Sequence, residues 1–435
     1  MKLEISKTQG FKLETDKIAS DKSISHRCAI FALLSNQPSF VRNYLKGEDT
    51  LDTLEIAKKL GLKVEKQENG MLLLPPQKIL EPATILYCGN AGTAMRLYAG
   101  LLSAQKGMFI LSGDKYLNQR PMKRVVEPLR SIGAEILGRS DGNLAPLVII
   151  GNPKLKAFCY TSKIPSAQVK SAMLLSALFA QGESVYYEPE LSRNHSEKML
   201  RGMGAEIESN VQENGEICVR IQPLKAPLKP LELDVPSDPS SAFFFAVGIA
   251  ITPNTSGILH NVLLNKTRIE AFKVLEKMGV YISYQETSKT YESIGNITIN
   301  APESLRAVEL SDKISWLIDE IPALAIAMAC AKGESRVKNA EELRVKETDR
   351  IKAIVDNLKL CGIEAQEFPD GFRIVGGKLK KACVDSFGDH RIAMSFAIAA
   401  LKCGMQIENA ECINVSFPNF LEILQSLTKI DQQGS

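Results

Sequence analysis

The segment Leu129-Arg-Ser-Ile-Gly133-Ala-Glu-Ile136 predicts a helix that ends at a glycine and is followed at once by a strand. Glycine adopts the left-handed backbone conformation without steric cost, so it commonly ends a helix. The alternating apolar residues that follow it indicate the start of a strand. The same pattern returns around Gly61, Gly204, Gly279 and Gly362.

These five glycines are spaced by 72, 71, 75 and 83 residues along the chain. Single helix–glycine–strand segments are common in α/β proteins, but five at near-constant spacing indicate a repeat. A period near 72 divides the 435 residues into about six units, the sixth lying around Phe420–Leu427 without its glycine. A unit of this length is a block of strands and helices rather than a solenoid repeat.

The six blocks suggest two domains of three. Residues 225–237 contain three prolines in thirteen positions and lie just after the third block, which favours a crossing between domains there. A cleft between two similar lobes is the default place for a ligand.

Composition excludes several function classes. The apolar fraction of 45% and charged fraction of 24% are typical of a globular protein, and 53 basic against 50 acidic residues give no general attraction to nucleic acid or membrane. Nine cysteines without a Cys-x-x-Cys favour neither a disulfide framework nor a zinc site. No signal peptide is expected, because residues 1–20 lack an apolar core, and the longest apolar stretches are too short to span a bilayer. A cytoplasmic location is therefore expected.

Two segments in the first half suggest anion sites at the starts of helices. Lys22-Ser-Ile-Ser-His-Arg27 opens an apolar helix that Asp21 or one of the serines can cap, although its charges could also be simply solvated. Cys88-Gly-Asn-Ala-Gly-Thr-Ala-Met-Arg96 is typical of a phosphate cradle or of a tight turn, and it lacks the ending of an ATP-binding loop. Proline after Arg120 predicts an extended backbone at that arginine. Ser166-Ala-Gln168 offers hydroxyl and amide groups before another apolar helix.

Charged residues gather at three places in the second half. Asp319 and Glu320 precede an apolar helix, where either could stabilise the helix dipole or act as a partly desolvated base. The segment 343–350 places Lys346 and Arg350 four residues apart, which predicts a shared helical face with Glu347 beside them, or else a surface ion-pair network. Asp389-His-Arg391 precedes another apolar helix.

Taken together, these clusters resemble, in the same order, the motifs of the 5-enolpyruvylshikimate-3-phosphate synthase family. The most specific strings are Gly89-Asn-Ala-Gly-Thr-Ala-Met-Arg96 and Arg344-Val-Lys-Glu-Thr-Asp-Arg350. The resemblance implies an α/β fold, a two-domain inside-out α/β barrel of six βαβαββ repeats, three per domain. It further implies a C-terminal lobe of residues 1–19 plus 230–435, an N-terminal lobe of residues 20–229, and an active site in the interdomain cleft.

The family transfers the enolpyruvyl group of phosphoenolpyruvate to the 5-hydroxyl of shikimate 3-phosphate, a step of the shikimate pathway. The residues that the resemblance assigns to shikimate 3-phosphate are Lys22, Ser23, Arg27, Ser166, Ala167, Gln168, Arg193, Asp319 and Lys346. Those that it assigns to phosphoenolpyruvate are Lys22, Gly92, Arg120, Gln168, Arg350 and Arg391. Asp319 is implied as the base for the attacking hydroxyl, with Glu347 and Lys22 handling protonation of the methylene carbon. No metal, no other cofactor, and no nucleic-acid or membrane partner is expected, and the protein is expected to be a monomer.

Two departures from the common family pattern stand out. Leu97 occupies a place where many members have proline, and Val415 a place where many have lysine. With Ser166-Ala-Gln168, these residues resemble the divergent branch that contains glyphosate-tolerant enzymes. Because Gly92 leaves room for the inhibitor, we nevertheless expect glyphosate to inhibit this enzyme.

Two alternatives remain. The related UDP-N-acetylglucosamine enolpyruvyl transferases share the fold, but this chain has Lys115 at the place of their cysteine and Ser23 at the place of their asparagine. A non-catalytic anion-binding protein of the same fold is the other alternative, against which the presence of Asp319, Glu347 and Lys22 counts.

Overall fold

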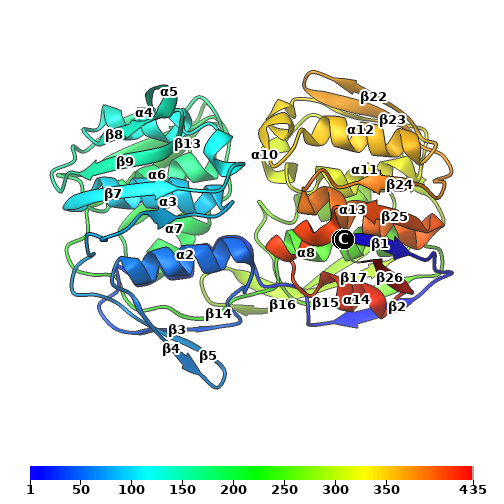
Figure 1. Ribbon diagram of the computed structural model, residues 1–435, viewed down its shortest axis with the longest axis horizontal. Coiled ribbons are helices and arrows are strands. Elements are labelled where there is room, and N and C mark those ends of the chain that lie inside the picture. The colour runs from blue at the N-terminus through cyan, green and yellow to red at the C-terminus, as the bar shows by residue number, and fades with distance from the viewer. Residues whose placement is uncertain (434–435) are drawn as a thin grey trace. The chain divides into compact units, whose positions relative to one another are not determined.

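The computed structural model describes residues 1–433 and divides the chain into two compact units (Figure 1). The N-terminal unit is Ser20–Val235, and the C-terminal unit combines Met1–Ala19 with Pro236–Ser435. Gly434 and Ser435, the end of the predicted C-terminal lobe, lie outside the described residues. The sequence places the crossing at residue 230, but strand β14 (Glu232–Asp234) pairs in parallel with β3 (Ser39–Arg42) and so belongs to the N-terminal unit.

The predicted helix–glycine–strand segments are confirmed. Gly61, Gly133, Gly204, Gly279 and Gly362 all have positive φ angles, between 76° and 108°. The helix and strand that flank each glycine are α2 (Glu48–Lys59) and β4 (Lys63–Gln67), α4 (Lys123–Ser131) and β8 (Glu135–Gly138), α7 (His195–Gly202) and β12 (Ile207–Val211), α9 (Glu270–Lys277) and β16 (Tyr281–Lys289), and α12 (Arg350–Leu360) and β22 (Glu364–Phe368). The sixth pair is α14 (Phe420–Gln425) and β26 (Ile430–Gln433).

The N-terminal unit contains three four-stranded sheets with one common plan. The strand orders are β14-β3-β5-β4, β6-β7-β9-β8 and β10-β11-β13-β12. The strands not yet given are β5 (Gly70–Leu74), β6 (Leu86–Tyr87), β7 (Gly107–Ser112), β9 (Leu144–Gly151), β10 (Cys159–Thr161), β11 (Ser184–Glu188) and β13 (Ile217–Ile221). In each sheet the first pair of strands is parallel and the other two pairs are antiparallel.

The C-terminal unit repeats this plan in three more sheets, ordered β2-β15-β17-β16, β19-β21-β23-β22 and β24-β25-β1-β26. Their remaining strands are β1 (Lys2–Ile5), β2 (Lys12–Thr15), β15 (Ser256–Leu263), β17 (Ser293–Asn300), β19 (Glu309–Leu310), β21 (Glu334–Val337), β23 (Gly371–Val375), β24 (Cys383–Asp385) and β25 (Met405–Glu408). Strands β1 and β2, from the start of the chain, therefore complete two sheets of this unit.

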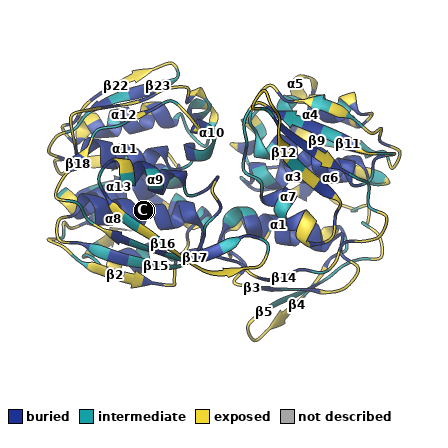
Figure 2. Cartoon of the chain, turned by 180° about the vertical axis from the view of Figure 1, so that it is seen from behind, coloured by how far each residue is buried: buried dark blue, intermediate teal, exposed yellow. Residues whose placement is uncertain are grey.

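Each unit has its most apolar helices inside and its sheets outside. The inner helices of the N-terminal unit are α1 (Lys22–Ala32), α3 (Gly92–Ser103) and α6 (Ala167–Ala177), and those of the C-terminal unit are α8 (Pro239–Ile251), α11 (Ile321–Ala329) and α13 (His390–Cys403). Every residue of α8 and α11 is buried, which is why these helices are apolar on all sides. Figure 2 shows the buried helices against sheets with exposed residues. Helices α3 and α6 approach so closely that a Cβ at Gly100 would lie 2.2 Å from the carbonyl oxygen of Ala172.

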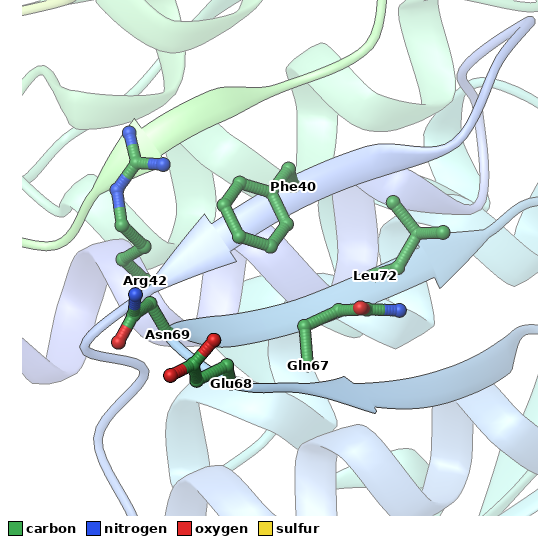
Figure 3. Close-up of a pocket in the computed structure, with 6 residues that line it drawn as sticks. All are labelled: Phe40, Arg42, Gln67, Glu68, Asn69 and Leu72. Atoms are coloured by element: carbon green, nitrogen blue, oxygen red, sulfur yellow. The ribbon is translucent and has the colours of Figure 1, made fainter.

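Other features lie apart from these helices. A pocket over strands β3, β4 and β5 is lined by Phe40, Arg42, Gln67, Glu68, Asn69 and Leu72 (Figure 3). None of the candidate residues lines this pocket. Within residues 1–433, no helix has both the length and the apolar character needed to cross a membrane.

Candidate functional site

The start of α1 presents the first candidate residues of the N-terminal unit. Of the caps that the sequence allows, Asp21 is the one observed: it accepts a hydrogen bond from the backbone N–H of Ile24 at 2.8 Å. The Lys22 ammonium forms an ion pair with Asp49, which lies in the first turn of α2 and is almost fully buried. Burial, together with Lys22 and Arg27, holds the pKa of His26 well below its usual value. The imidazole of His26 is therefore neutral near pH 7 and adds no positive charge beside Lys22 and Arg27.

Arg27 is buried and joins three helices. Its Nε donates to Ser196 Oγ of α7 at 2.9 Å and its Nη2 donates to Ser171 Oγ of α6 at 3.0 Å. Its Nη1 donates to the backbone carbonyl of Ser23 at 2.9 Å, within α1. These bonds fix the guanidinium of Arg27 beside the first turn of α1, where Ser23 also lies.

The first turn of α3 lies beside Arg120. A Cβ at Gly92 would be 3.0 Å from Arg96 Nη1 and 3.4 Å from Arg120 Nη1, so both guanidinium groups lie close to this glycine. The Asn90 side chain accepts a hydrogen bond from Arg120. Arg120 has φ −78° and ψ 141°, which confirms the extended backbone predicted from the following proline. Ala91, at the N-cap of α3, provides no side-chain cap.

Helix α6 brings Gln168 to the same place. Arg96 donates to Gln168 Oε1, and Gln168 Nε2 donates to Thr93 Oγ1 at 2.9 Å. Ser166 caps the helix through the backbone N–H of Val169. The structure therefore brings Gly92, Arg120 and Gln168 together, with Ser166 and Ala167 on the adjoining turn. Arg193 is partly buried in the segment just before α7.

The strongest cluster of the C-terminal unit is centred on Arg350, whose side chain is 1% exposed. Its Nε donates to Asp389 at 2.8 Å and its Nη2 to Glu347 at 2.6 Å. Its Nη1 lies 3.6 Å from Asp319 Oδ1. Asp389 also caps α13 by accepting from the backbone N–H of Arg391 at 2.8 Å. The three nearby carboxylates raise the pKa of Arg350 against the opposing effect of burial, so this guanidinium stays charged.

Asp319 lies between two arginines. Nη1 of Arg391 donates to the Asp319 carbonyl oxygen at 3.0 Å, and its Nε lies 3.7 Å from Asp319 Oδ1. Burial lowers the pKa of Lys346, while Asp319 and Glu342 act in the opposite direction. The structure therefore gathers Asp319, Arg350 and Arg391 and places Lys346 within electrostatic reach.

One local prediction is wrong. Lys346 and Arg350 do not share a helical face, because Lys346 has an extended backbone (φ −82°, ψ −152°) after a 3-10 turn at Glu341–Val345. Helix α12 begins only at Arg350, where Asp349 caps it through the N–H of Lys352 at 3.1 Å. The cap ends the run of non-helical residues, and Glu347 reaches Arg350 from outside the helix.

The contacts of several acidic residues near these groups were not predicted from the sequence. Asp389 precedes an apolar helix with the signature of an N-cap, and this signal could have identified it. Asp49, the partner of Lys22, lies 27 residues away from it and carries no comparable signal. Glu320, which directly follows Asp319, belongs to a buried network: it accepts from Ser240 Oγ, and Arg268 donates to both Ser240 and Asp238. Among the described residues, no three or more His, Cys, Asp or Glu side chains are grouped so as to hold a metal ion.

Comparisons with known proteins agree across almost the whole chain. The sequence model of the family EPSP synthase (3-phosphoshikimate 1-carboxyvinyltransferase) matches residues 9–424. A 3-phosphoshikimate 1-carboxyvinyltransferase of a Nitratiruptor species is 55% identical over 430 residues, 99% of each chain. Another, of Wolinella succinogenes, is 58% identical over 425 residues, 97% of this chain and 96% of the relative.

Solved structures give the same result. The EPSP synthase of Acinetobacter baumannii matches with a TM-score of 0.86 and 36% identity over 99% of this chain and 100% of the other. The enolpyruvyl transferase NikO of Streptomyces tendae, at 16% identity and a TM-score of 0.76 over 99% and 98%, supports the fold alone. The predicted fold class is confirmed. The chain therefore has the enolpyruvyl transferase fold and belongs to the EPSP synthase family of 3-phosphoshikimate 1-carboxyvinyltransferases, which are transferase enzymes.

Proposed function

We propose that this enzyme transfers the enolpyruvyl group of phosphoenolpyruvate to the 5-hydroxyl of shikimate 3-phosphate and releases phosphate. The observation that carries the proposal is the cluster in which one carboxylate, Asp319, lies beside the guanidinium groups of Arg350 and Arg391. Such a cluster supplies both a base and the charges that bind an anion. Family membership supports the same reaction. The alternative, a UDP-N-acetylglucosamine enolpyruvyl transferase, is not favoured, because the matching family and the relatives are 3-phosphoshikimate 1-carboxyvinyltransferases.

Charge matching supports the substrate assignment. Two phosphates and two carboxylates carry a total of roughly −5 to −6 near neutral pH. The seven basic residues assigned to the substrates are Lys22, Arg27, Arg120, Arg193, Lys346, Arg350 and Arg391. Without substrate, Lys22 and Arg350 pair with the protein's own carboxylates, which limits the repulsion among the cations. The proposal needs residues of both units, because four of these seven lie in the N-terminal unit and three in the C-terminal unit.

We assign shikimate 3-phosphate mainly to residues of the N-terminal unit. The hydroxyls of Ser23 and Ser166 and the guanidinium groups of Arg27 and Arg193 suit a phosphorylated sugar acid. Ala167 joins Ser166 and Gln168 at the start of α6, and Lys22 lies on the first turn of α1. Asp319 and Lys346 complete this set from the C-terminal unit.

We assign phosphoenolpyruvate to Lys22, Gly92, Arg120, Gln168, Arg350 and Arg391. The absence of a side chain at Gly92 leaves space beside the guanidinium of Arg120. The Nη1 of Arg350 is buried and makes no hydrogen bond to the residues described, although Asp319 lies 3.6 Å away. This group is placed to donate to an anionic oxygen, because a charge-assisted hydrogen bond there would satisfy it.

The reaction proceeds by addition and elimination. Asp319 takes the proton of the 5-hydroxyl as its oxygen attacks C2 of phosphoenolpyruvate, and Glu347 or Lys22 delivers a proton to C3. In the second step, C3 loses a proton, the C2–C3 double bond re-forms and phosphate leaves from C2. The basic residues stabilise the negative charge of the intermediate and of the departing phosphate.

Phosphate release tests the proposal. The wild-type enzyme is expected to release phosphate from phosphoenolpyruvate only when shikimate 3-phosphate is present. Replacing the proposed base in Asp319→Asn should lower kcat by about 100-fold or more. The matched control is Asp312→Asn, the same change at an exposed position, which should stay near the wild-type rate. Turnover of the Asp319 variant within about tenfold of wild type would contradict the base assignment.

We further propose a monomer that works in the cytoplasm. All nine cysteines fall within the described residues and none forms a disulfide, which suits a reducing compartment. Light scattering on the purified protein tests the monomer, since a particle of twice the 47.8 kDa chain mass would contradict it.

A further inference from the structure

The N-terminal unit contains a buried charge cluster that none of the roles above uses. It consists of Lys170 in α6, Glu188 at the end of β11 and Glu197 in the first turn of α7. The Lys170 ammonium lies 2.6 Å from Glu188 Oε1 and 2.8 Å from Glu197 Oε1. The three side chains are 0%, 0% and 2% exposed. We call these residues the Lys170 triad.

A buried triad of this kind constrains the elements that carry it. Charges without water must keep their partners, so separating the ammonium from either carboxylate is strongly unfavourable. Burial is the largest single influence on the pKa of Lys170 and acts to lower it, but the combined effects of Glu197 and Glu188 outweigh it and raise the pKa, so the lysine stays charged. The triad thus connects one strand and two helices by contacts that are shielded from solvent.

The triad also fixes the loop between β11 and α7. Glu188 Oε1 accepts a hydrogen bond from the backbone N–H of Ser192 at 3.0 Å, in addition to the lysine. The Lys170 ammonium lies 3.4 Å from the Ser192 carbonyl oxygen. Both backbone groups of Ser192, its N–H and its carbonyl, therefore contact the triad. Arg193 is the next residue along the chain.

A second network runs beside the first. Ser171 follows Lys170 and Ser196 precedes Glu197, and their hydroxyl oxygens are 2.7 Å apart. Arg27 donates to both of these serines. The contacts of Lys170 thus set the spacing of α6 and α7 at the point where Arg27 is bound.

We propose that Lys170 is a positioning residue for shikimate 3-phosphate, acting through Arg193 and Arg27 rather than touching the substrate. The inference rests on the proposed function, because it takes those arginines as ligands of this substrate. It predicts a selective effect: binding of shikimate 3-phosphate depends on Lys170, whereas the KM for phosphoenolpyruvate depends on it much less.

Three variants test this role. In Lys170→Met the ammonium is removed and the two carboxylates are left facing each other. In Glu188→Ala the anchor of Ser192 is removed, but the neutral pair of Lys170 and Glu197 remains, so this variant is the safer one to fold. In Glu188→Gln an acceptor for Ser192 is kept, and the effect should fall between wild type and Glu188→Ala. The matched control is Leu73→Ala, a fully buried residue in β5, whose sheet contains no part of the triad.

The measurements are kcat, both KM values, thermal unfolding and calorimetric binding of shikimate 3-phosphate alone. We expect Lys170→Met and Glu188→Ala to weaken binding and raise the KM for shikimate 3-phosphate by about tenfold, with the KM for phosphoenolpyruvate changed less than about threefold. Leu73→Ala should lower the melting temperature and leave both KM values unchanged. If Lys170→Met does not fold, Glu188→Ala decides the matter.

Two results would overturn the inference. One is unchanged binding of shikimate 3-phosphate in Glu188→Ala, and the other is an equal rise of both KM values. A wild-type enzyme that releases no phosphate with shikimate 3-phosphate would instead refute the proposed function itself.

Discussion

Replacing Asp389 by asparagine tests how the C-terminal unit holds Arg350 in place. Asp389 is fully buried and has two tasks: it caps α13 through the N–H groups of Arg391 and Ile392, and it accepts from Nε of Arg350 at 2.8 Å. Asparagine keeps an oxygen for the cap, but its amide nitrogen cannot accept from Arg350. The change therefore removes the ion pair and largely preserves the helix cap.

The size of the effect follows from these contacts. Removing one partner of a buried ion pair costs about 3–5 kcal/mol. Arg350 retains its 2.6 Å bond to Glu347, which offsets part of this loss. We therefore expect Asp389→Asn to lower the free energy of unfolding by about 2 kcal/mol. The KM for phosphoenolpyruvate should rise at the same time, because Arg350 loses the contact that orients it.

Urea unfolding and steady-state kinetics measure these two effects. The matched control is Asp349→Asn, which changes the N-cap of α12 in the same way. Its arginine partner, Arg344, is 27% exposed, so this change should cost less than about 1 kcal/mol. Equal losses of stability in the two variants, or an unchanged KM in Asp389→Asn, would refute the argument that the buried pair holds Arg350.

Three further predictions follow from single groups. Burial lowers the pKa of Lys346 below the ordinary lysine value of 10.5, so kcat/KM for shikimate 3-phosphate should fall with rising pH at a pH below that value. Lys346→Arg should move this fall to higher pH, because arginine stays charged, and an unchanged pH profile would contradict the prediction. Burial and nearby acids, chiefly Asp49, raise the pKa of the partly buried Asp52 from its ordinary value of 3.8 to about 6. Ionisation of Asp52 therefore opposes folding progressively as the pH rises from 3.8 to about 6, and fully above that pH. Asp52→Asn should stabilise the protein by about 1 kcal/mol at pH 8, after allowance for solvent screening, and by nothing near pH 3, as urea unfolding at both pH values would show. Glyphosate at millimolar concentration should inhibit the wild-type enzyme, and an uninhibited wild type would contradict this prediction. In Gly92→Ala the added Cβ would press on Arg96 and Arg120, so this variant should have a higher KM for phosphoenolpyruvate and weaker inhibition by glyphosate than the wild type.

Local signals account for the parts of the structure that the sequence predicts correctly. The positive φ angles of Gly133 and its four counterparts are intrinsic to a helix that ends in this way. The extended backbone of Arg120 follows from the ring of the next residue. Each of these depends on neighbours in the chain, so a short segment is enough to predict it.

The sequence is less informative where partners come from distant segments. From the sequence alone, one would expect surface positions for the charged side chains of Lys170, Glu188 and Glu197. Only the packing of α6 against β11 and α7 shows that they are buried. At Lys346 the local sequence pattern instead predicts a helix that does not form. Its spacing from Arg350 fits a helix, but α12 begins only at Arg350, after the cap at Asp349. Lys346 precedes this cap and has an extended backbone.

The helix caps explain how a cation-rich site is built on helix starts. Within residues 1–433, the helices with a side-chain cap are α1, α6, α8, α12 and α13. Four of these five carry candidate ligands in their first turn, where the helix dipole disfavours a positive charge. For Lys22, Arg350 and Arg391 the cap is an aspartate directly before the helix, whose negative charge offsets that cost and fixes the backbone. Helix α3 begins at Gly92 without a side-chain cap, and the basic groups near this glycine are Arg96, one turn further along the same helix, and Arg120, from outside it. An anion at this turn would itself supply the missing negative charge, which gives the uncapped start of α3 a physical reason within the proposed site.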